Sequence, residues 1–502
     1  MGRPLPFCWA LLLARVSARN VLYIAVDDLR SDIGAYGLPV KTPHIDQLAA
    51  SGLRFTHAYC QLSVCAPSRM SFMTSRRPDT FGVWNFIDTV PNTTLSTPRM
   101  FRDAGYLTLG LGKTFHQDSG AWNAANTWSA LEDGGLPYYP YEASTCPHGN
   151  EGGGHCMKDD VDIYDWNLTQ TTLEYLDYAV NATQAGATRP FFLMTGFRKP
   201  HAPWEYPQRM WDLYTDAEIA TAEFDTLGAT TPQVAWSNQL GVTLENGTSF
   251  PYSPYAPVPK WVQQDQRHAY YADVSYVDEH VGAILARLDA TPGLRDATAV
   301  IFHADHGYHL GEHGEWEKKS NFDLVVRVPL IARVPWKPRA VGATTGALVE
   351  LVDVMPTLAS LLELPAPPGV DGADVSALFD DPTGASGGAK PAAYHQYPVC
   401  GFGGWNATRD ACNSTPKNEF DVMSYSVRTA DWRYTLWLPW DNETLVARWD
   451  GGAGESAEEL YAHAGDDSTD MDRWENTNLA ADAAYADITA ALRAQLRAQF
   501  AP

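Results

Sequence analysis

The segment 20–30, NVLYIAVDDLR, places an uninterrupted apolar run directly before two aspartates. Every side chain from Val21 to Val26 is aliphatic or aromatic, so neither face of such a strand is suited to water. This pattern is typical of a strand in a parallel sheet that is covered on both faces. Further short apolar segments that predict strands of the same type lie at 106–112, 190–196 and 298–304.

Helix signals lie between these segments. Thr42, Pro43 and Gly52 have the spacing of an N-cap, a first helical residue and a stop, and Thr97, Pro98 and Gly105 repeat it. A longer amphipathic stretch carries one apolar face, made of Tyr270, Val274, Val277, Val281, Ile284 and Leu288. Strands that alternate with helices predict an α/β fold with a large, mostly parallel sheet flanked by helices.

The composition changes after Pro365. The segments LPAPPGVDG and DPTGASGGAKP are typical of loops or linkers, and YSVRTADWRYTLWLPW then alternates as strands do. A helix is expected from Ala480 to Phe500. We therefore predict a catalytic domain at 19–415 and a smaller C-terminal α+β subdomain at 416–502.

The first 18 residues have the pattern of a signal peptide. An early arginine precedes an apolar run from Phe7 to Ala14, and small residues up to Ala18 suit cleavage. No stretch approaches the roughly 20 apolar residues of a membrane span. Glycosylation sequons lie at Asn92, Asn167, Asn181, Asn246, Asn406, Asn413 and Asn442. These features predict a glycoprotein of the secretory pathway, either lysosomal or extracellular.

The charge balance limits the partners. The 502 residues include 36 Lys and Arg against 60 Asp and Glu, which gives a net charge of −24. Such acidity argues against nucleic acid and anionic membrane surfaces as partners.

The cysteines agree with an oxidising compartment. Cys146 with Cys156 and Cys400 with Cys412 close short glycine-containing loops, which predicts two disulfides. Cys60 and Cys65 then remain, and a disulfide between these two near neighbours is the structural alternative to a functional role for Cys65.

Polar residues follow two of the predicted strands. Asp27 and Asp28 end the first, and Asp305 and His306 end another. The carboxyl ends of parallel strands meet at one edge of a sheet, where ligand sites form. Three converging carboxylates repel one another unless a cation lies among them, and oxygen ligands favour calcium or magnesium. His306 is a less typical calcium ligand and could instead face a bound substrate.

Cationic and imidazole side chains follow the same strand ends. Lys113 and His116 come after 106–112, His201 after 190–196 and Lys318 after the Asp305–His306 pair. In CAPSR, at 65–69, Pro67 suits the first turn of a helix, whose N–H groups favour an anion, and Arg69 adds a fixed positive fork. This set is suited to an ester of a small tetrahedral oxyanion, sulfate or phosphate.

At this point the sequence resembles the sulfatase family of the alkaline-phosphatase superfamily. The motifs VDDLR, CAPSR, GKTFH, KPHAP and DHGYHLGEHGEWEK occur in that order, and APSRMSFMTSRRPDT and GEHGEWEKKSNFD resemble the iduronate-2-sulfatase subfamily. The resemblance covers about Asn20 to Ala480. It departs at Ser31, where proline is expected, and at Arg198, where histidine is expected, and it gives no role to Cys60.

The resemblance implies a modified nucleophile and one metal ion. A formylglycine-generating enzyme would oxidise Cys65 to formylglycine during biosynthesis. One Ca²⁺ would then be bound by Asp27, Asp28, Asp305, His306 and the modified Cys65.

The resemblance also implies roles for the remaining residues. A hydroxyl group of the formylglycine hydrate would attack sulfur, while Arg69, Lys113 and Lys318 offset developing charge. His201 would contact the sulfate and the leaving oxygen, and His116 would help remove the proton that lets sulfate leave. The implied substrate is a sulfated glycan with a 2-O-sulfated terminal uronate, as in glycosaminoglycan degradation; another sulfated polysaccharide is the alternative.

Two other classes of function remain open from the sequence. A metal-dependent phosphatase or phosphodiesterase of the same superfamily would use Ser or Thr as the nucleophile, usually with two zinc ions, and Cys65 argues against it. A glycan-binding protein with a disabled site could use some of the 17 Trp and 24 Tyr residues for sugar stacking. The complete catalytic set argues against disablement.

Overall fold

A computed structural model describes residues 19–91, 93–116, 127–129, 146, 154–184, 189–237, 241–244, 248–450 and 456–501. The predicted signal peptide and the sequons at Asn92 and Asn246 lie outside these residues. Among the described helices, none is long and apolar enough to cross a membrane.

The main sheet is mixed and mostly parallel. In the described residues its strands run in the order β13-β2-β12-β9-β1-β5-β3, and β14 also pairs with β2. Only the β12 pairings with β2 and β9 are antiparallel. The strands are β1 (Asn20–Val26), β2 (Leu53–Tyr59), β3 (Leu107–Gly112), β5 (Phe191–Phe197), β9 (Thr298–Ala304), β12 (Arg327–Arg333), β13 (Ala343–Thr345) and β14 (Val349–Glu350).

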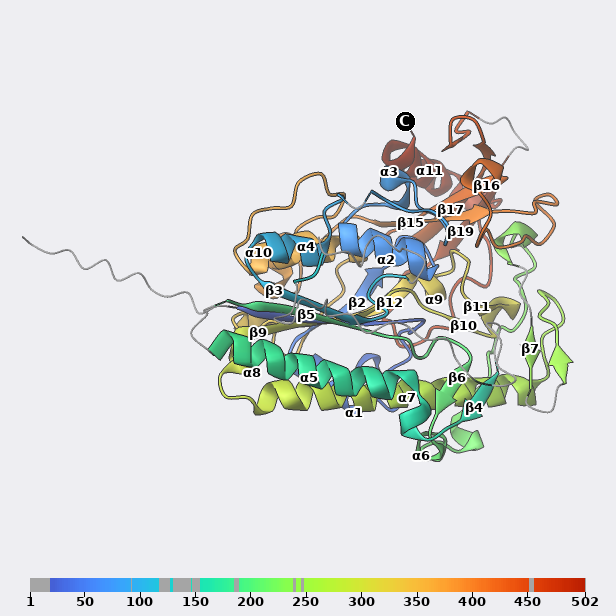
Figure 1. Cartoon of the computed structure of the whole chain (residues 1–502). Coiled ribbons are helices and arrows are strands. Elements are labelled where there is room, and N and C mark those ends of the chain that lie inside the picture. The colour runs from blue at the N-terminus through green and yellow to red at the C-terminus, as the bar shows by residue number, and fades with distance from the viewer. Residues whose placement is uncertain are drawn as a thin grey trace, which may run out of the picture.

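Helices cover both faces of this sheet (Figure 1). One layer contains α2 (Cys65–Thr74), α4 (Thr97–Asp103) and α10 (Val354–Leu361). The other contains α1 (Pro43–Ala50), α5 (Tyr164–Gln184) and α7 (Lys260–Ala290). Between these layers, β1 is buried from Val21 to Val26, as its apolar run predicts. The predicted α/β fold is confirmed.

The predicted starts of the first two helices agree with the structure to within one residue. Thr42 is the N-cap of α1 and Pro43 is its first residue. Ser96 is the N-cap of α4, one residue before the predicted Thr97. The predicted apolar face of α7 is buried along its full length.

A second, antiparallel sheet lies at the C-terminal end of the chain. It contains β15 (Ala393–Val399), β16 (Val422–Arg428), β17 (Trp432–Asp441), β18 (Val446–Ala447) and β19 (Ala457–Ala462). The last helix, α11 (Ala486–Phe500), packs against β16 and β17 and begins six residues after the predicted start. The division at residue 416 remains a prediction, and β15 joins the second sheet from the N-terminal side of it.

The remaining elements are short. The helices are α3 (Pro78–Phe81), α6 (Gln208–Trp211), α8 (Leu294–Ala297) and α9 (Asp323–Val326). Three two-stranded pairings are formed by β4 (His155–Met157) with β6 (Trp204–Tyr206), β7 (Val242–Thr243) with β8 (Ser249–Phe250), and β10 (His309–Leu310) with β11 (Trp316–Glu317).

Both predicted disulfides are present, between Cys146 and Cys156 and between Cys400 and Cys412. Cys60 and Cys65 are both free and buried, so the alternative disulfide between them does not form.

Close contact between β3 and β5 requires glycine next to the predicted site. Gly112 pairs with Gly196, and a Cβ atom added at Gly196 would lie 2.1 Å from the Lys113 carbonyl oxygen. Real Cβ atoms do not approach a backbone oxygen so closely. With any residue other than glycine at position 196, the backbone of the two strand ends would therefore have to shift.

We expect Gly196→Ala to lower the free energy of unfolding by about 1–3 kcal/mol, because the added methyl group overpacks this contact. Urea unfolding measures the change. Gly346→Ala is the matched control, since its nearest neighbour would be 4.0 Å away, and it should change stability by less than about 0.5 kcal/mol. Equal stability of the two variants would show that β3 and β5 do not approach in this way.

Candidate active site

Four predicted metal ligands converge where β1 and β9 end. The parallel register pairs Val26 with Ala304, so the residues that follow these two strands lie side by side. The Asp28 backbone N–H donates to Oδ1 of Asp305 over 3.2 Å. His306 Nε2 lies 3.4 Å from Oδ1 of Asp28, and all of these side chains are buried. The predicted convergence at the sheet edge is therefore observed.

Cys65 is the first residue of α2 and lies against this cluster. Its Sγ atom is 3.3 Å from His306 Nε2, 3.3 Å from Lys318 Nζ and 4.0 Å from Oδ1 of Asp28. The side chain is almost completely buried. A sulfur atom at a helix N-terminus among a lysine, an imidazole and a carboxylate lies where a nucleophile could act on an anion.

Three cationic side chains contact the three carboxylates. Lys318 Nζ donates to Oδ1 of Asp28 over 2.6 Å, and Lys113 Nζ pairs with Asp27. Arg69 reaches two of the acids, with Nε 2.9 Å from Asp305 Oδ2 and a terminal nitrogen 3.4 Å from Asp27 Oδ1. These contacts fix Arg69 and both lysines beside Cys65, as expected for groups that bind an oxyanion.

The histidines are oriented by backbone carbonyls. His306 Nδ1 lies 3.0 Å from the Gly307 carbonyl oxygen, and His201 Nδ1 lies 2.6 Å from that of Ala202. An Nδ1 proton donated to a carbonyl leaves the Nε2 lone pair available in a neutral ring. For His306 this lone pair faces Cys65, which is the arrangement of a metal ligand.

Burial and nearby cations keep the imidazoles neutral. Burial, then the charge of Lys113, lowers the pKa of His116 to about 3. Burial, then Lys318 and Lys113, lowers the pKa of His201 well below its usual value. At neutral pH both rings are therefore neutral and can accept a hydrogen bond.

The carboxylates are suited to a divalent cation. Asp27, Cys65, Asp305 and His306 offer ligand atoms that all lie within 4.8 Å of one another, as do Asp27, Asp28, Cys65 and His201. Burial raises the pKa of Asp28 to about 6, while Lys318 opposes and Asp27 reinforces this shift. A hard cation with oxygen ligands would relieve the repulsion that remains.

Two site contacts have no signal in the sequence analysis. Ser68 Oγ donates to the Asp305 carbonyl oxygen over 2.5 Å, and the ring of Phe86 stacks on His116 at 4.8 Å between centroids. Ser68 belongs to the CAPSR segment, so its place could have been suspected. Phe86 comes from a loop after α3, and no local pattern links it to His116.

The two residues that depart from the family pattern, Ser31 and Arg198, are outside the predicted set of site residues. Ser31 follows Asp28 closely in the sequence, and its side chain is buried. Arg198 is buried after β5, where its guanidinium lies 3.7 Å from Glu205 and its backbone N–H donates to Asp165. Neither departure falls on a residue predicted for catalysis or metal binding.

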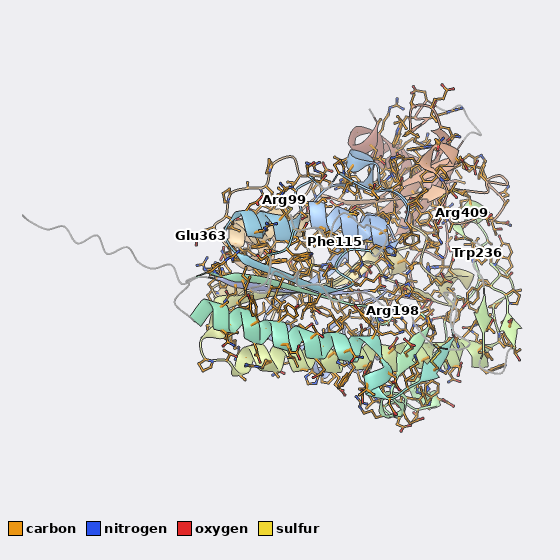
Figure 2. All side chains as sticks on the ribbon, viewed as in Figure 1. Arg99, Phe115, Arg198, Trp236, Glu363 and Arg409 are labelled. Carbon is orange, nitrogen blue, oxygen red and sulfur yellow. A yellow bond between two sulfur atoms is a disulfide. The ribbon has the colours of Figure 1, made fainter. Side chains whose placement is uncertain are left out.

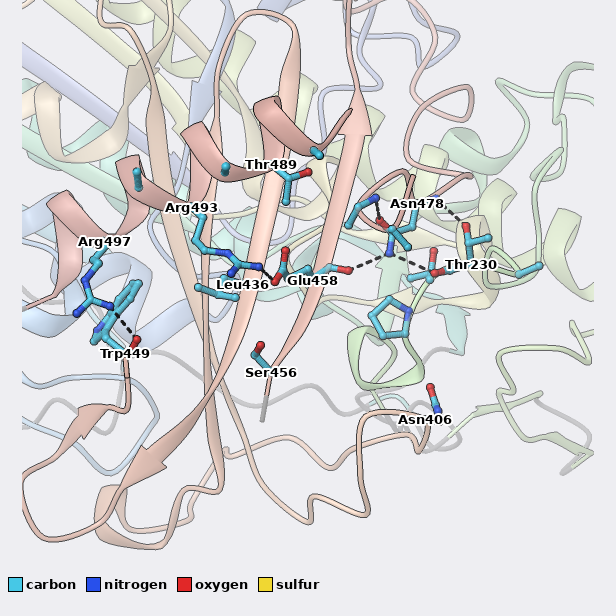
Figure 3. A pocket seen from close by; sticks show the side chains of 18 residues that line it. Thr230, Asn406, Leu436, Trp449, Ser456, Glu458, Asn478, Thr489, Arg493 and Arg497 are labelled. Atoms are coloured by element: carbon cyan, nitrogen blue, oxygen red, sulfur yellow. Dashed lines mark hydrogen bonds and ion pairs between the residues drawn. The ribbon is translucent and has the colours of Figure 1, made fainter. Parts of the chain in front are cut away.

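A separate groove lies in the C-terminal region (Figure 3). It has a volume of about 920 Å³ and is lined by α11 and by residues such as Thr230, Trp449 and Asn478. Within the described part of the chain, none of the predicted catalytic residues lines it. The candidate site is therefore the buried cluster around Cys65.

Known proteins share this arrangement of the chain. The sulfatase family model matches residues 19–364. Iduronate 2-sulfatase of Mus musculus is 35% identical over 89% of this chain and 91% of its own length, and that of Homo sapiens is 34% identical over 87% and 88%. The phosphonate monoester hydrolase of Agrobacterium radiobacter has the same fold, with a TM-score of 0.70 at 20% identity over 96% of each chain. The chain therefore belongs to the sulfatase family, and it is a sulfatase.

Proposed function

We propose that this sulfatase removes the 2-O-sulfate group from a terminal uronate of a sulfated glycan, with a nucleophile made from Cys65. The observation that carries the proposal is the position of Cys65, at the start of α2 and within 3.3 Å of both Lys318 and His306. The iduronate 2-sulfatases that the chain resembles along most of their length support the choice of sugar.

Asp27, Asp28, Asp305 and His306 would hold one Ca²⁺ together with the modified Cys65. Once oxidised to formylglycine and hydrated, Cys65 would supply a nucleophilic hydroxyl group, and a cation held by these residues would supply Lewis-acid polarisation of the sulfate oxygens. The oxygen-rich ligand set supports calcium over zinc, which prefers nitrogen and sulfur.

The chain's own side chains would bind and neutralise the sulfate group. Lys318 reaches the position of the nucleophile, and Lys113 and Arg69 flank it with fixed positive charge. Charge that develops on the sulfate oxygens is stabilised by these pre-organised donors. A neutral His201 would contact the leaving oxygen, and a neutral His116 would accept the proton that frees the sulfate.

Lys318→Ala should lower kcat for aryl sulfate hydrolysis about 10²-fold, because one donor to the developing charge is lost. Steady-state kinetics with 4-nitrophenyl sulfate measure the effect, normalised to the fraction of Cys65 that is modified. Lys337→Ala is the control, since Lys337 pairs with the exposed Asp380 away from the site. Similar kcat values for the two variants would remove Lys318 from the mechanism.

A substrate panel tests the proposed specificity. The protein, produced together with a formylglycine-generating enzyme, is given a heparin disaccharide with a 2-O-sulfated terminal uronate and a matched disaccharide sulfated only at the glucosamine 6-O position. We expect sulfate release from the first. Release from the second alone would indicate another sulfated polysaccharide, and glycan binding without release would favour a binding protein.

4-Nitrophenyl phosphate is the control for the type of ester. We expect it to be hydrolysed far more slowly than 4-nitrophenyl sulfate, since Cys65 takes the place of the Ser or Thr of the phosphatases. Preferred hydrolysis of the phosphate would contradict the proposal.

A further inference from the structure

The backbone on both sides of Lys318 has an uncommon conformation. Glu317 has φ 68° and Lys319 has φ 80°, so both lie in the left-handed region although neither is glycine. Such conformations cost free energy and persist only where surrounding contacts fix them. The contacts that hold this segment therefore decide where the Lys318 ammonium group lies.

One set of contacts joins the segment to the residues before Cys65. The Lys319 backbone N–H donates to the Ser63 carbonyl oxygen over 3.3 Å. Ser63 Oγ in turn donates to the Ser320 carbonyl oxygen over 2.6 Å. Because Ser63 lies two residues before Cys65, these bonds set the distance between Lys318 and the start of α2.

The other contact comes from Arg409, far away in the sequence. Its side chain is completely buried, and one terminal nitrogen donates to the Lys319 carbonyl oxygen over 2.7 Å. Its Nε donates to the Val234 carbonyl oxygen, also over 2.7 Å. Arg409 thus connects the Lys318 segment to the 233–235 turn, and Figure 2 shows its position near Trp236.

Arg409 is itself held rigidly. It lies in the loop that the Cys400–Cys412 disulfide closes, and its guanidinium packs over the rings of Tyr397 at 4.6 Å and Trp437 at 5.5 Å. Burial lowers the pKa of Arg409, so the buried charge carries a desolvation cost. A buried guanidinium that donates mainly to backbone carbonyls is suited to fixing a loop by its planar fork.

We propose that Arg409 is a positioning residue for the sulfatase reaction. Arg409 holds the left-handed backbone around Lys318, so that Nζ of Lys318 reaches Cys65 and Asp28. The inference rests on the proposed function, because Lys318 must stabilise the reacting sulfate group for its position to matter. The second sheet and its disulfide loop then contribute directly to the geometry of the catalytic site.

A double-mutant cycle tests this role. Arg409→Lys keeps the charge but loses the fork that holds the Lys319 carbonyl. We expect it to lower kcat for 4-nitrophenyl sulfate about tenfold, with KM changed less than about twofold, since misplacement mainly affects the transition state. In the Lys318→Ala background the same substitution should lower kcat less than about twofold.

Two further variants separate positioning from folding. Ser63→Ala removes the bond from Ser63 Oγ to the Ser320 carbonyl oxygen with a small change, and its effect on kcat should likewise disappear in the Lys318→Ala background. Arg428→Lys is the matched control: Arg428 is also completely buried in the second sheet, but it contacts Asp323 and Asp466. All rates are normalised to the fraction of Cys65 converted to formylglycine, and thermal unfolding is followed in parallel.

The outcomes distinguish the two proposals. If Lys318→Ala has no effect on kcat, the proposed function fails. If Lys318→Ala lowers kcat and Arg409→Lys lowers it by the same factor with and without Lys318, the effect of Arg409→Lys is that of a general structural defect. In that case only the positioning role fails. If Arg409→Lys yields no folded protein, the Ser63→Ala cycle decides: an effect on kcat that persists in the absence of Lys318 overturns the inference.

Discussion

Replacing Cys65 with alanine is expected to lower kcat for sulfate ester hydrolysis at least about 10³-fold, because the substitution removes the proposed nucleophile. Sγ lies at the point where Lys318, His306 and Asp28 converge, so the substitution removes the reacting group and leaves its surroundings intact. Kinetics with 4-nitrophenyl sulfate and circular dichroism on the same sample measure activity and folding together.

Cys60→Ala is the matched control for this experiment. Cys60 is also free and completely buried, but its Sγ lies near the Val325 carbonyl oxygen, at 3.9 Å, instead of in the cluster. Burial, then the charge of Asp305, raises the pKa of its thiol, which makes it unreactive. We expect Cys60→Ala to keep kcat within about twofold. Full activity of Cys65→Ala would refute the assigned nucleophile.

Removal of the proposed metal ion is expected to lower kcat about 10³-fold, since a bound cation would contribute several kcal/mol of charge stabilisation. The protein is dialysed against a chelator, its metal content is measured by mass spectrometry, and activity is followed as Ca²⁺, Mg²⁺ or Zn²⁺ is returned. We expect one bound ion per chain and recovery with Ca²⁺.

Asp28→Asn gives an independent test of the ligand set. The amide keeps the shape of Asp28 but removes its charge, so Ca²⁺ affinity should fall about 10–100-fold. Asp380→Asn, at an exposed carboxylate, is the control. If the protein that was dialysed against a chelator keeps its activity without metal, a metal-dependent mechanism is contradicted.

The sequence predicted that several of the candidate residues lie close together, because these residues follow strand ends. A buried strand shows itself by its apolar run, and parallel strands bring the residues after them to one edge. This pattern predicts that Asp27, Asp305 and Lys113 lie close together, and they do so in the structure. The cap signals at Thr42 and Pro43 are equally local and were equally predictable.

Features that depend on contacts between distant segments could not be predicted. Hydrophobic periodicity does not specify strand neighbours, so it gave no sign that β12 pairs antiparallel between β9 and β2. Phe86 and Arg409 were missed for the same reason, since an isolated aromatic or arginine has no local pattern that assigns it to a site. Their roles appear only when the packing is known.

The central claim is that Cys65 becomes the catalytic aldehyde. Mass spectrometry of the tryptic peptide that ends at Arg69, from protein produced in a cell with a formylglycine-generating enzyme, tests it directly. We expect the peptide to carry formylglycine at Cys65 and an unmodified thiol at Cys60. An active preparation in which Cys65 remains a thiol, or is bridged to Cys60, would contradict the account.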